Sequence, residues 1–377
     1  MSSHHIWLRD HCRCPECFHP VTKQRLHSTF EIPADVKPEG VQATPGGLRA
    51  TWPSQHVSVY PWSWLWTNAY DRPRTADDRR SVSPALWGAE ISEHPPTVPY
   101  DGVMDPSDRG LLDWLSKIER WGFCFVSGVP VSTDATEELC KRIGFIRETQ
   151  YGKFWDFTSD LAKGDTAYTT LALGAHTDNT YFTDPCGIQL FHLLSHTDGS
   201  GGATLLVDGF AAAARLKADR PDAYRLLAEV PVPAHAAGDP GELYRPYPPA
   251  GYPVLGHDAA GALVQVRWNN DDRSVMRSVA PERVEAWYDA IRTWNEYITA
   301  PEAEYWVQLQ PGTVVAIDNH RVMHGRSAFN GKRRMCGAYI GVDEYRSKLA
   351  VLKEKFSPPD SPEALMPEGR SIWHPYL

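Results

Sequence analysis

Hydrophobic and polar positions alternate in short runs along most of the chain, and helical periodicity is limited to a few stretches. Leu111, Leu112, Leu115 and Ile118 recur at helical spacing and predict an amphipathic helix over residues 105–121. A second helix is expected over residues 281–299. Short apolar runs predict strands at residues 122–126, 187–194, 203–207, 262–268, 313–317 and 333–340.

Residues before about 95 have a different pattern of apolar and polar positions. Residues 47–52 and 56–60 read as a hairpin, with Pro-Ser-Gln between the two strands. The apolar side chains that follow are expected to pack against the next domain; they are Trp62, Trp64, Leu65 and Trp66. The polar stretch 71–80 suits a solvated linker. We therefore expect an N-terminal domain with linker over residues 1–94 and a second domain over 95–377.

Many short strands with few regular helices between them favour an antiparallel sandwich or jelly roll over a parallel α/β sheet. The predicted class is mainly β with helices. The 377-residue chain carries a net charge of −9, which argues against nucleic acid as a partner. No apolar run approaches the roughly 18 residues that a membrane span needs.

Cysteine usage points to a reducing compartment. The seven cysteines are odd in number, and three of them crowd together at Cys12, Cys14 and Cys17, unlike a secreted disulfide framework. The chain begins Met-Ser-Ser-His-His and runs directly into Ile6, as a trimmed or tagged sequence would. We expect a mitochondrial matrix or cytoplasmic location, with no targeting segment visible.

Two His-x-Asp motifs are candidates for a metal site. Non-haem iron oxygenases use two histidines and one carboxylate, and residues i and i+2 of a strand point to the same side. His176 and Asp178 follow a strand-like run and precede aromatic residues. His196 and Asp198 lie in a polar, glycine-rich stretch that predicts a turn. We therefore favour His176 and Asp178 as ligands and expect His196 to be a surface loop residue.

The pattern leaves two ligands open, the third iron ligand and the fourth ligand of a zinc site. His320 and His324 are both candidates for the third iron ligand, and composition does not choose between them. Cys12, Cys14 and Cys17 can supply three corners of a tetrahedral zinc site. The candidate fourth ligands are His56, His11 and His19.

Several long motifs occur in an order that resembles the trimethyllysine and γ-butyrobetaine dioxygenases, a branch of the taurine dioxygenase-like superfamily. They are WLRDHC (7–12), RETQYG (147–152), TSD (158–160), GDTAY (164–168), HTD (176–178), PCGIQ (185–189), LLVDGF (205–210) and DNHRVMHGR (318–326). The resemblance covers most of the chain. It implies a double-stranded β-helix (jelly roll) catalytic domain that binds Fe(II) and 2-oxoglutarate, preceded by a small zinc-binding β domain.

The same motif matching assigns roles to single residues. It implies His324, not His320, as the third iron ligand, and His176 over His196. Arg333 occupies the place of the arginine that binds 2-oxoglutarate, with Arg334 as the competitor. An arginine suits that role because its planar fork grips a carboxylate with two charge-assisted bonds. Thr204 is a further candidate contact, with a hydroxyl satisfied inside the sheet as the alternative.

The resemblance also implies a cage of aromatic rings for a trimethylammonium group, which has no N–H to donate. The matching positions are Tyr151, Trp155, Tyr168 and Tyr339. Asp165 stands where the trimethyllysine enzyme has Asp and the γ-butyrobetaine enzyme has Asn, and the alternative is a turn or cap residue. Asn269 or Asn270 is expected to bind the polar end of the substrate.

The expected activity is C3 hydroxylation of trimethyllysine, a small quaternary-ammonium amino acid, with O2 as oxidant and ascorbate in support. Hydroxylation of γ-butyrobetaine and a non-catalytic quaternary-amine binding module are the alternatives. The resemblance makes His56 the fourth zinc ligand, since the γ-butyrobetaine enzyme has its zinc histidine there. A homodimer is the candidate assembly.

Overall fold

The computed structural model describes residues 3–71, 83–158, 169–236, 245–248, 250–277, 279–357 and 372–373. The chain divides into two compact units, one made of residues 1–80 with 353–377 and the other of residues 81–352. Residues 83–94, which the sequence grouped with the N-terminal domain, belong to the larger unit, where Trp87 and Ile91 lie in a buried core. Apart from Asp71, the predicted linker lies outside the described residues.

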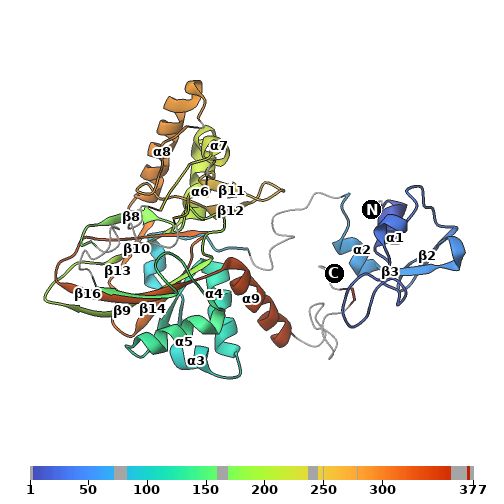
Figure 1. Cartoon of the computed structure of the whole chain (residues 1–377), viewed down its shortest axis with the longest axis horizontal. Coiled ribbons are helices and arrows are strands. Elements are labelled where there is room, and N and C mark those ends of the chain that lie inside the picture. Colours follow the sequence, from blue (N-terminus) through green and yellow to red (C-terminus); the bar gives the residue numbers. More distant parts are fainter. Residues whose placement is uncertain are drawn as a thin grey trace. The chain divides into compact units, whose positions relative to one another are not determined.

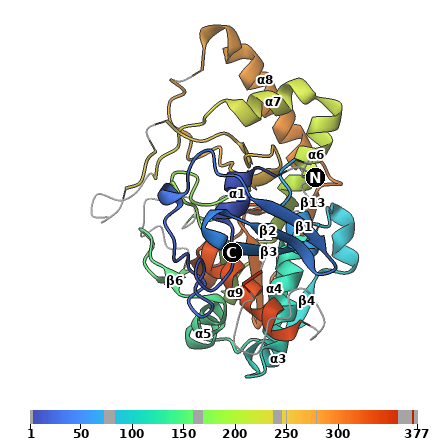
Figure 2. The same ribbon diagram turned by 90° about the vertical axis from the view of Figure 1, so that its right-hand side faces the viewer.

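The smaller unit contains a three-stranded antiparallel sheet, and its strands lie side by side next to α1 in Figure 2. Its elements are α1 (His5–Asp10), η1 (Thr29–Glu31), β1 (Gly40–Thr44), β2 (Gly47–Thr51), η2 (Pro53–Gln55), β3 (Val57–Pro61) and α2 (Trp62–Thr67). The predicted hairpin is confirmed, because β2 and β3 pair in antiparallel register.

Trp64 and Leu65 pack with Trp52 and Tyr60 in the core of the smaller unit. The reason is that α2 turns them toward the sheet, while Trp62 and Trp66 on the same helix stay exposed.

The larger unit is built on two antiparallel sheets. The main sheet has the order β4-β5-β14-β9-β16-β6, with β7 also paired to β16, and the smaller sheet has the order β13-β10-β15-β8. Their strands are β4 (Thr97–Pro99), β5 (Phe123–Ser127), β6 (Ile146–Arg147), β7 (Phe154–Thr158), β8 (Leu173–His176), β9 (Ile188–Thr197), β10 (Thr204–Asp208), β13 (Glu304–Val307), β14 (Thr313–Asp318), β15 (Val322–Arg326) and β16 (Lys332–Ile340). A separate pair is formed by β11 (Leu255–His257) and β12 (Leu263–Val266). Among the strands of the described residues, only the β4–β5 pair is parallel.

Side chains of the two sheets pack against each other in one core. Ile317 of β14 and Met335 of β16 meet Leu206 of β10 there. Leu205 and Val207, which flank Leu206, point instead to the opposite face of their sheet, as the period of two in a strand requires. This arrangement confirms the predicted mainly β jelly-roll class.

Helices cover the outer faces of both sheets (Figure 1). Against the smaller sheet pack α6 (Gly209–Asp219), α7 (Pro221–Glu229) and α8 (Val284–Ile298), the last preceded by η6 (Pro281–Arg283). The main sheet is covered by α4 (Arg109–Trp121) and α5 (Thr133–Ile143), with η4 (Ala89–Glu93), α3 (Tyr100–Met104) and α9 (Val342–Phe356) completing the set. Among the described residues no helix combines the length and apolarity needed to cross a membrane.

Candidate functional site

His176 and His324 are brought together by the strand pairing of the smaller sheet. His176 is the last residue of β8, His324 is the middle residue of β15, and the two are direct antiparallel partners. Directly opposite residues in such a pair lie close enough for their side chains to touch, and the two imidazole rings are 4.4 Å apart between centroids. Asp178 follows β8 by two residues, so it reaches the same place from the strand end.

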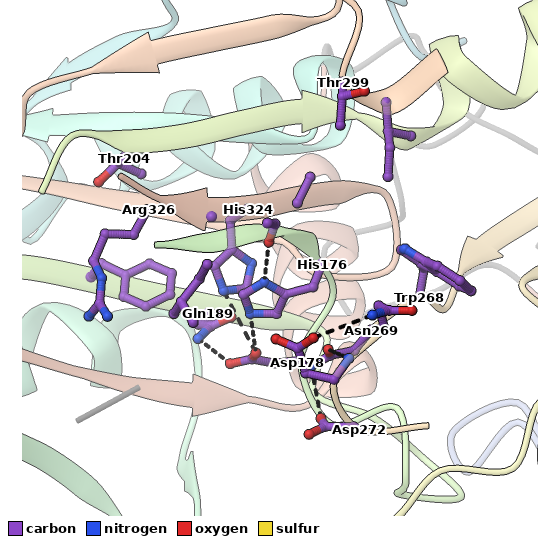
Figure 3. A pocket seen from close by; sticks show the side chains of 18 of the residues that line it. His176, Asp178, Gln189, Thr204, Trp268, Asn269, Asp272, Thr299, His324 and Arg326 are labelled. Atoms are coloured by element: carbon purple, nitrogen blue, oxygen red, sulfur yellow. Dashed lines mark hydrogen bonds and ion pairs between the residues drawn. The ribbon is translucent and has the colours of Figure 1, made fainter. Parts of the chain in front are cut away.

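The three side chains converge on one point (Figure 3). Asp178 Oδ1 lies 3.2 Å from His176 Nε2 and 3.7 Å from His324 Nε2. Ligand atoms of all three residues fall within 4.8 Å of one another. His176 Nδ1 bonds to the carbonyl oxygen of Gly174 at 2.8 Å, which makes Nδ1 the protonated nitrogen and leaves Nε2 free to bind a metal.

The protonation states also suit a metal. Burial and the neighbouring His176 lower the pKa of His324 to about 3, so this imidazole is neutral. Burial alone would raise the pKa of Asp178, but His324 and His176 hold it well below its usual range. Burial likewise opposes charge on His176, yet its hydrogen bond to Asp178 raises its pKa. The set therefore holds a proton between His176 and Asp178 where a metal cation can replace it.

A cavity of about 680 Å³ opens onto this triad and also contains Arg333, Arg326 and Thr204. Arg333 is buried, and its Nε has no hydrogen-bond partner among the described residues. Burial and the positive charge of Arg326 lower the pKa of Arg333 to about 10. Thr204 of β10 is the cross-strand partner of Arg326 on β15. Two buried guanidinium groups and a hydroxyl in one cavity fit a ligand that carries carboxylates.

Arg334, the neighbour of Arg333, is placed differently. Its guanidinium is about half exposed and pairs with Asp156 at 2.9 Å. The alternation expected along β16 therefore separates the two arginines.

Three of the four expected cage residues meet in the same cavity. The Tyr339 ring lies 6.4 Å from the rings of both Tyr151 and Trp155, measured between centroids. Trp155 and Tyr339 are buried. The fourth expected ring, Tyr168, lies outside the described residues, as does Asp165.

Asn269 and Asn270 line the cavity but are occupied locally. Asn269 Nδ2 donates to Asp272 at 2.8 Å, and its side-chain oxygen accepts from the backbone of Asp271 at 3.0 Å. Asn270 accepts from Arg273 Nε at 3.3 Å. A ligand that bonds either amide would have to replace these contacts.

A second cluster forms in the smaller unit. His56 Nε2 lies 3.4 Å from Cys12 Sγ, 3.7 Å from Cys14 Sγ and 3.5 Å from Cys17 Sγ. A tetrahedral zinc about 2.3 Å from sulfur and about 2.0 Å from nitrogen would separate the two kinds of ligand atom by about 3.5 Å. The four residues thus have the spacing of a closed zinc site.

The surroundings of this cluster support that fit. His56 Nδ1 faces the Glu16 carboxylate at 3.3 Å, which turns Nε2 toward the sulfurs. Burial raises the pKa of the Cys17 thiol to about 12, so a thiolate there requires a nearby cation. The two other candidate histidines bond elsewhere: His11 to the carbonyl oxygen of Trp7, and His19 to backbone N–H groups that follow it.

The other histidine candidates of the larger unit lie outside the triad. His196 is part of β9, not of a loop, because β9 continues to Thr197 in register with β16; its Nε2 bonds to the carbonyl oxygen of Asn330 at 2.8 Å. His320 is buried beside the carbonyl oxygen of Pro185.

The sequence interpretation missed Arg326 and Gln189. Arg326 stands two residues after His324 on a strand, so the period of two places both side chains on one face. Gln189 is a polar residue inside an apolar strand, and its Nε2 donates to Asp178 Oδ2 at 2.6 Å. A buried polar residue between apolar neighbours is the signal that could have identified it.

The fold and these sites agree with known families. Residues 78–339 match the family model described as taurine catabolism dioxygenase TauD, TfdA family, and residues 1–66 match the gamma-butyrobetaine hydroxylase-like N-terminal model. A proposed alpha-ketoglutarate-dependent taurine dioxygenase from Burkholderia xenovorans shares the fold, with a TM-score of 0.50 and 14% identity over 69% of this chain and 92% of that one. The chain belongs to the TauD, TfdA family of dioxygenases.

Within that family the similar proteins include trimethyllysine dioxygenases. The enzyme from Meyerozyma guilliermondii is 43% identical over 92% of this chain and 89% of its own length. The human enzyme, which is mitochondrial, is 41% identical over 92% of this chain and 82% of its own length. A γ-butyrobetaine dioxygenase from a Pseudomonas species is more distant, at 33% identity over 93% of this chain and 90% of that one.

Proposed function

We propose that this chain hydroxylates N6-trimethyllysine at C3, using Fe(II), O2 and 2-oxoglutarate, and releases succinate and CO2. This reaction is the first step of carnitine biosynthesis. The observation that carries the proposal is the convergence of three groups on one cavity: the His176, Asp178 and His324 triad, the buried Arg333, and a set of aromatic rings. The similarity to trimethyllysine dioxygenases supports the choice of substrate.

His176, Asp178 and His324 hold the iron. Two imidazoles and one carboxylate are the donor set that would hold Fe(II) and leave room for the co-substrate and O2. When bound there, the iron supplies the redox chemistry that divides O2 between 2-oxoglutarate and the substrate carbon. The protein's part is to point the three ligands at one place, which the β8–β15 pairing and the Gly174 contact accomplish.

Arg333 binds the distal carboxylate of 2-oxoglutarate, and Thr204 and Arg326 assist. Arg333 is buried and its Nε has no hydrogen-bond partner among the described residues, so a carboxylate that enters the cavity can pair with it. Arg326 adds positive charge, and it is itself held by the carbonyl oxygens of Thr169 and Leu171 at 2.8 and 3.0 Å. These contacts keep Arg326 in place whether or not the co-substrate is bound.

Tyr151, Trp155 and Tyr339 receive the trimethylammonium group, with Tyr168 as the fourth ring. Each ring face contributes roughly 0.5–2 kcal/mol to binding such a cation. The cage fixes the charged end of the substrate and so sets which carbon lies nearest the iron. Because both candidate substrates end in the same cation, the cage does not distinguish them.

Asp165 is the residue that selects trimethyllysine. Trimethyllysine carries an α-ammonium that γ-butyrobetaine lacks, and a carboxylate facing it would be left desolvated and unpaired with the wrong substrate. Asn269 and Asn270 bind the polar end of the substrate. Hydroxylation of γ-butyrobetaine is the second candidate, favoured only by the weaker similarity to that dioxygenase.

The remaining features complete the proposal. A structural zinc binds Cys12, Cys14, Cys17 and His56. Ascorbate supports turnover by keeping iron reduced, the protein works in the mitochondrial matrix or cytoplasm, and the assembly is a homodimer.

Mass spectrometry of the purified protein with Fe(II), 2-oxoglutarate, ascorbate and air tests the function. Trimethyllysine should gain one oxygen atom while succinate accumulates in equal amount, and γ-butyrobetaine should react far more slowly. Preferred oxidation of γ-butyrobetaine would move the chain to the second candidate. Binding of either amine without any product would instead indicate the non-catalytic binding module.

A further inference from the structure

The two carboxylate oxygens of Asp178 have different neighbours. Oδ1 faces the two imidazoles, at 3.2 Å from His176 Nε2 and 3.7 Å from His324 Nε2. Oδ2 accepts two hydrogen bonds, from Gln189 Nε2 at 2.6 Å and from the Tyr339 hydroxyl at 2.8 Å. Two donors occupy the lone pairs of Oδ2, so Oδ1 is the oxygen available to a metal ion.

The main sheet holds these two donors as a pair. Gln189 on β9 and Tyr339 on β16 are direct partners in antiparallel register. Such partners share one face of a sheet with Cβ atoms about 4.5–5.5 Å apart, so both side chains can reach one oxygen. Gln189 is 1% exposed and Tyr339 4% exposed, so both donors are largely shielded from solvent. Only the NH2 of Gln189 can donate to a carboxylate, which fixes the orientation of its amide.

Tyr339 has a second set of contacts on its ring. The centroid of its ring lies 6.4 Å from the ring centroid of Tyr151 and 6.4 Å from that of Trp155. One side chain therefore borders the cation site with its ring and holds a metal ligand with its hydroxyl. A cation on the ring withdraws electron density from the phenol, which makes the O–H a stronger donor to Asp178.

We propose that Tyr339 is a positioning residue that couples occupancy of the aromatic cage to metal binding at the triad, with Gln189 as the second donor to Asp178. The inference rests on the proposed function, since it needs iron at the triad and a quaternary ammonium in the cage. Linkage makes the effect reciprocal: a cation in the cage tightens metal binding, and the metal tightens cation binding by the same factor.

Titration of zinc-loaded, iron-free protein with Mn(II) tests the coupling, with free Mn(II) counted by electron paramagnetic resonance. Mn(II) prefers oxygen and nitrogen ligands, so it leaves the thiolate cluster alone. Trimethyllysine should lower the Mn(II) Kd of the wild type. Tyr339→Phe keeps the ring and loses the hydroxyl. It should raise the Kd about 10- to 100-fold, as loss of a hydrogen bond to a ligand typically does, and abolish the effect of trimethyllysine.

Cation binding separates this role from general damage. Because the ring face remains, the affinity of metal-free Tyr339→Phe for trimethyllysine should stay within about twofold of the wild type. Tyr151→Phe is the matched control. It removes a hydroxyl from the same cage but no donor to Asp178, so Mn(II) affinity and its response to trimethyllysine should persist. Gln189→Met should weaken Mn(II) binding and keep that response, since Tyr339 remains.

The outcomes also separate this inference from the proposed function. A wild type that binds neither Mn(II) at the triad nor trimethyllysine contradicts the function itself. A wild type that binds both independently, or a Tyr339→Phe variant with unchanged Kd and unchanged response, overturns the coupling and leaves the function intact.

Discussion

Arg333 and Arg334 are adjacent on β16 and point to opposite sides of the sheet. Arg333 lines the cavity with an unpartnered Nε among the described residues, whereas Arg334 meets solvent and Asp156. The presence of an arginine on β16 therefore does not identify the residue that binds the co-substrate. The side of the sheet to which the arginine points distinguishes the two candidates.

Arg333→Met is expected to raise the KM for 2-oxoglutarate roughly 10- to 100-fold, since hydrogen bonds to a charged group are worth about 1.5–3 kcal/mol. Arg334→Met should change that KM by less than about twofold, because exposed ion pairs contribute little. Steady-state kinetics with 2-oxoglutarate as the varied substrate measures both. Equal effects of the two substitutions would contradict the assignment of Arg333.

His176→Ala is expected to abolish turnover and metal binding at the triad, because it removes one of the three proposed metal ligands. His196→Ala removes a histidine from the other His-x-Asp motif, whose ring bonds to the carbonyl oxygen of Asn330 away from the triad. It should retain bound iron and most of the activity. Iron content and succinate release are the measurements, and a folded but equally inactive His196→Ala would reverse the choice of motif.

The sequence could identify some of these residues and not others, for physical reasons. His176 and Asp178 are neighbours in the chain, so local spacing was enough to pair them. His324 and His320 belong to the same segment, and only the β8–β15 register brings His324 to His176. Family resemblance selected His324 because spacing within the segment had no information about that register.

At the scale of elements, strands were easier to predict than helices. The strand expected at 187–194 is β9, which continues to Thr197 because β16 offers it partners that far. The helix expected over 105–121 begins only at Arg109, since Asp108 has a φ of 66° that interrupts it. The sequence interpretation did not identify α5, α6, α7 or α9. In α6 the run of alanines at 211–214 hid the periodicity, since Ala is compatible with a buried or an exposed face.

Gly337 on β16 shows how closely the strands around the cage approach. A Cβ at this position would collide with the carbonyl oxygen of Leu190 on β9 and with the ring of Trp155 on β7. Gly337→Ala should lower the free energy of unfolding by about 1–3 kcal/mol, as overpacking does, and weaken cation binding by displacing Trp155. Urea unfolding measures the first effect. Gly174→Ala on β8, where an added Cβ meets no atom within 4 Å, is the stability control. Identical midpoints for the two variants would contradict this explanation.

At the scale of the molecule, the two clusters of proposed metal ligands belong to different compact units. Metal analysis of protein purified without chelator should find about one tightly held zinc per chain, independent of iron. Cys14→Ser should lose this zinc and unfold at a lower temperature, because the cluster ties the N-terminal segment to β3. His19→Ala, which alters a histidine outside the cluster, should keep it. Absence of zinc from the wild type would contradict the zinc site, and the three cysteines would then be ordinary thiols.

The positions of the ligands along the chain set an order in which the clusters can form during synthesis. The proposed zinc ligands are complete once His56 has left the ribosome, and thiolate and imidazole can capture the ion while most of the polypeptide is still to be made. The proposed iron ligands are complete only with His324, and they meet only when β15 has paired with β8. A nascent chain that stalls between these points would carry zinc and no iron. At the proposed site, iron could therefore bind only after the jelly roll has formed.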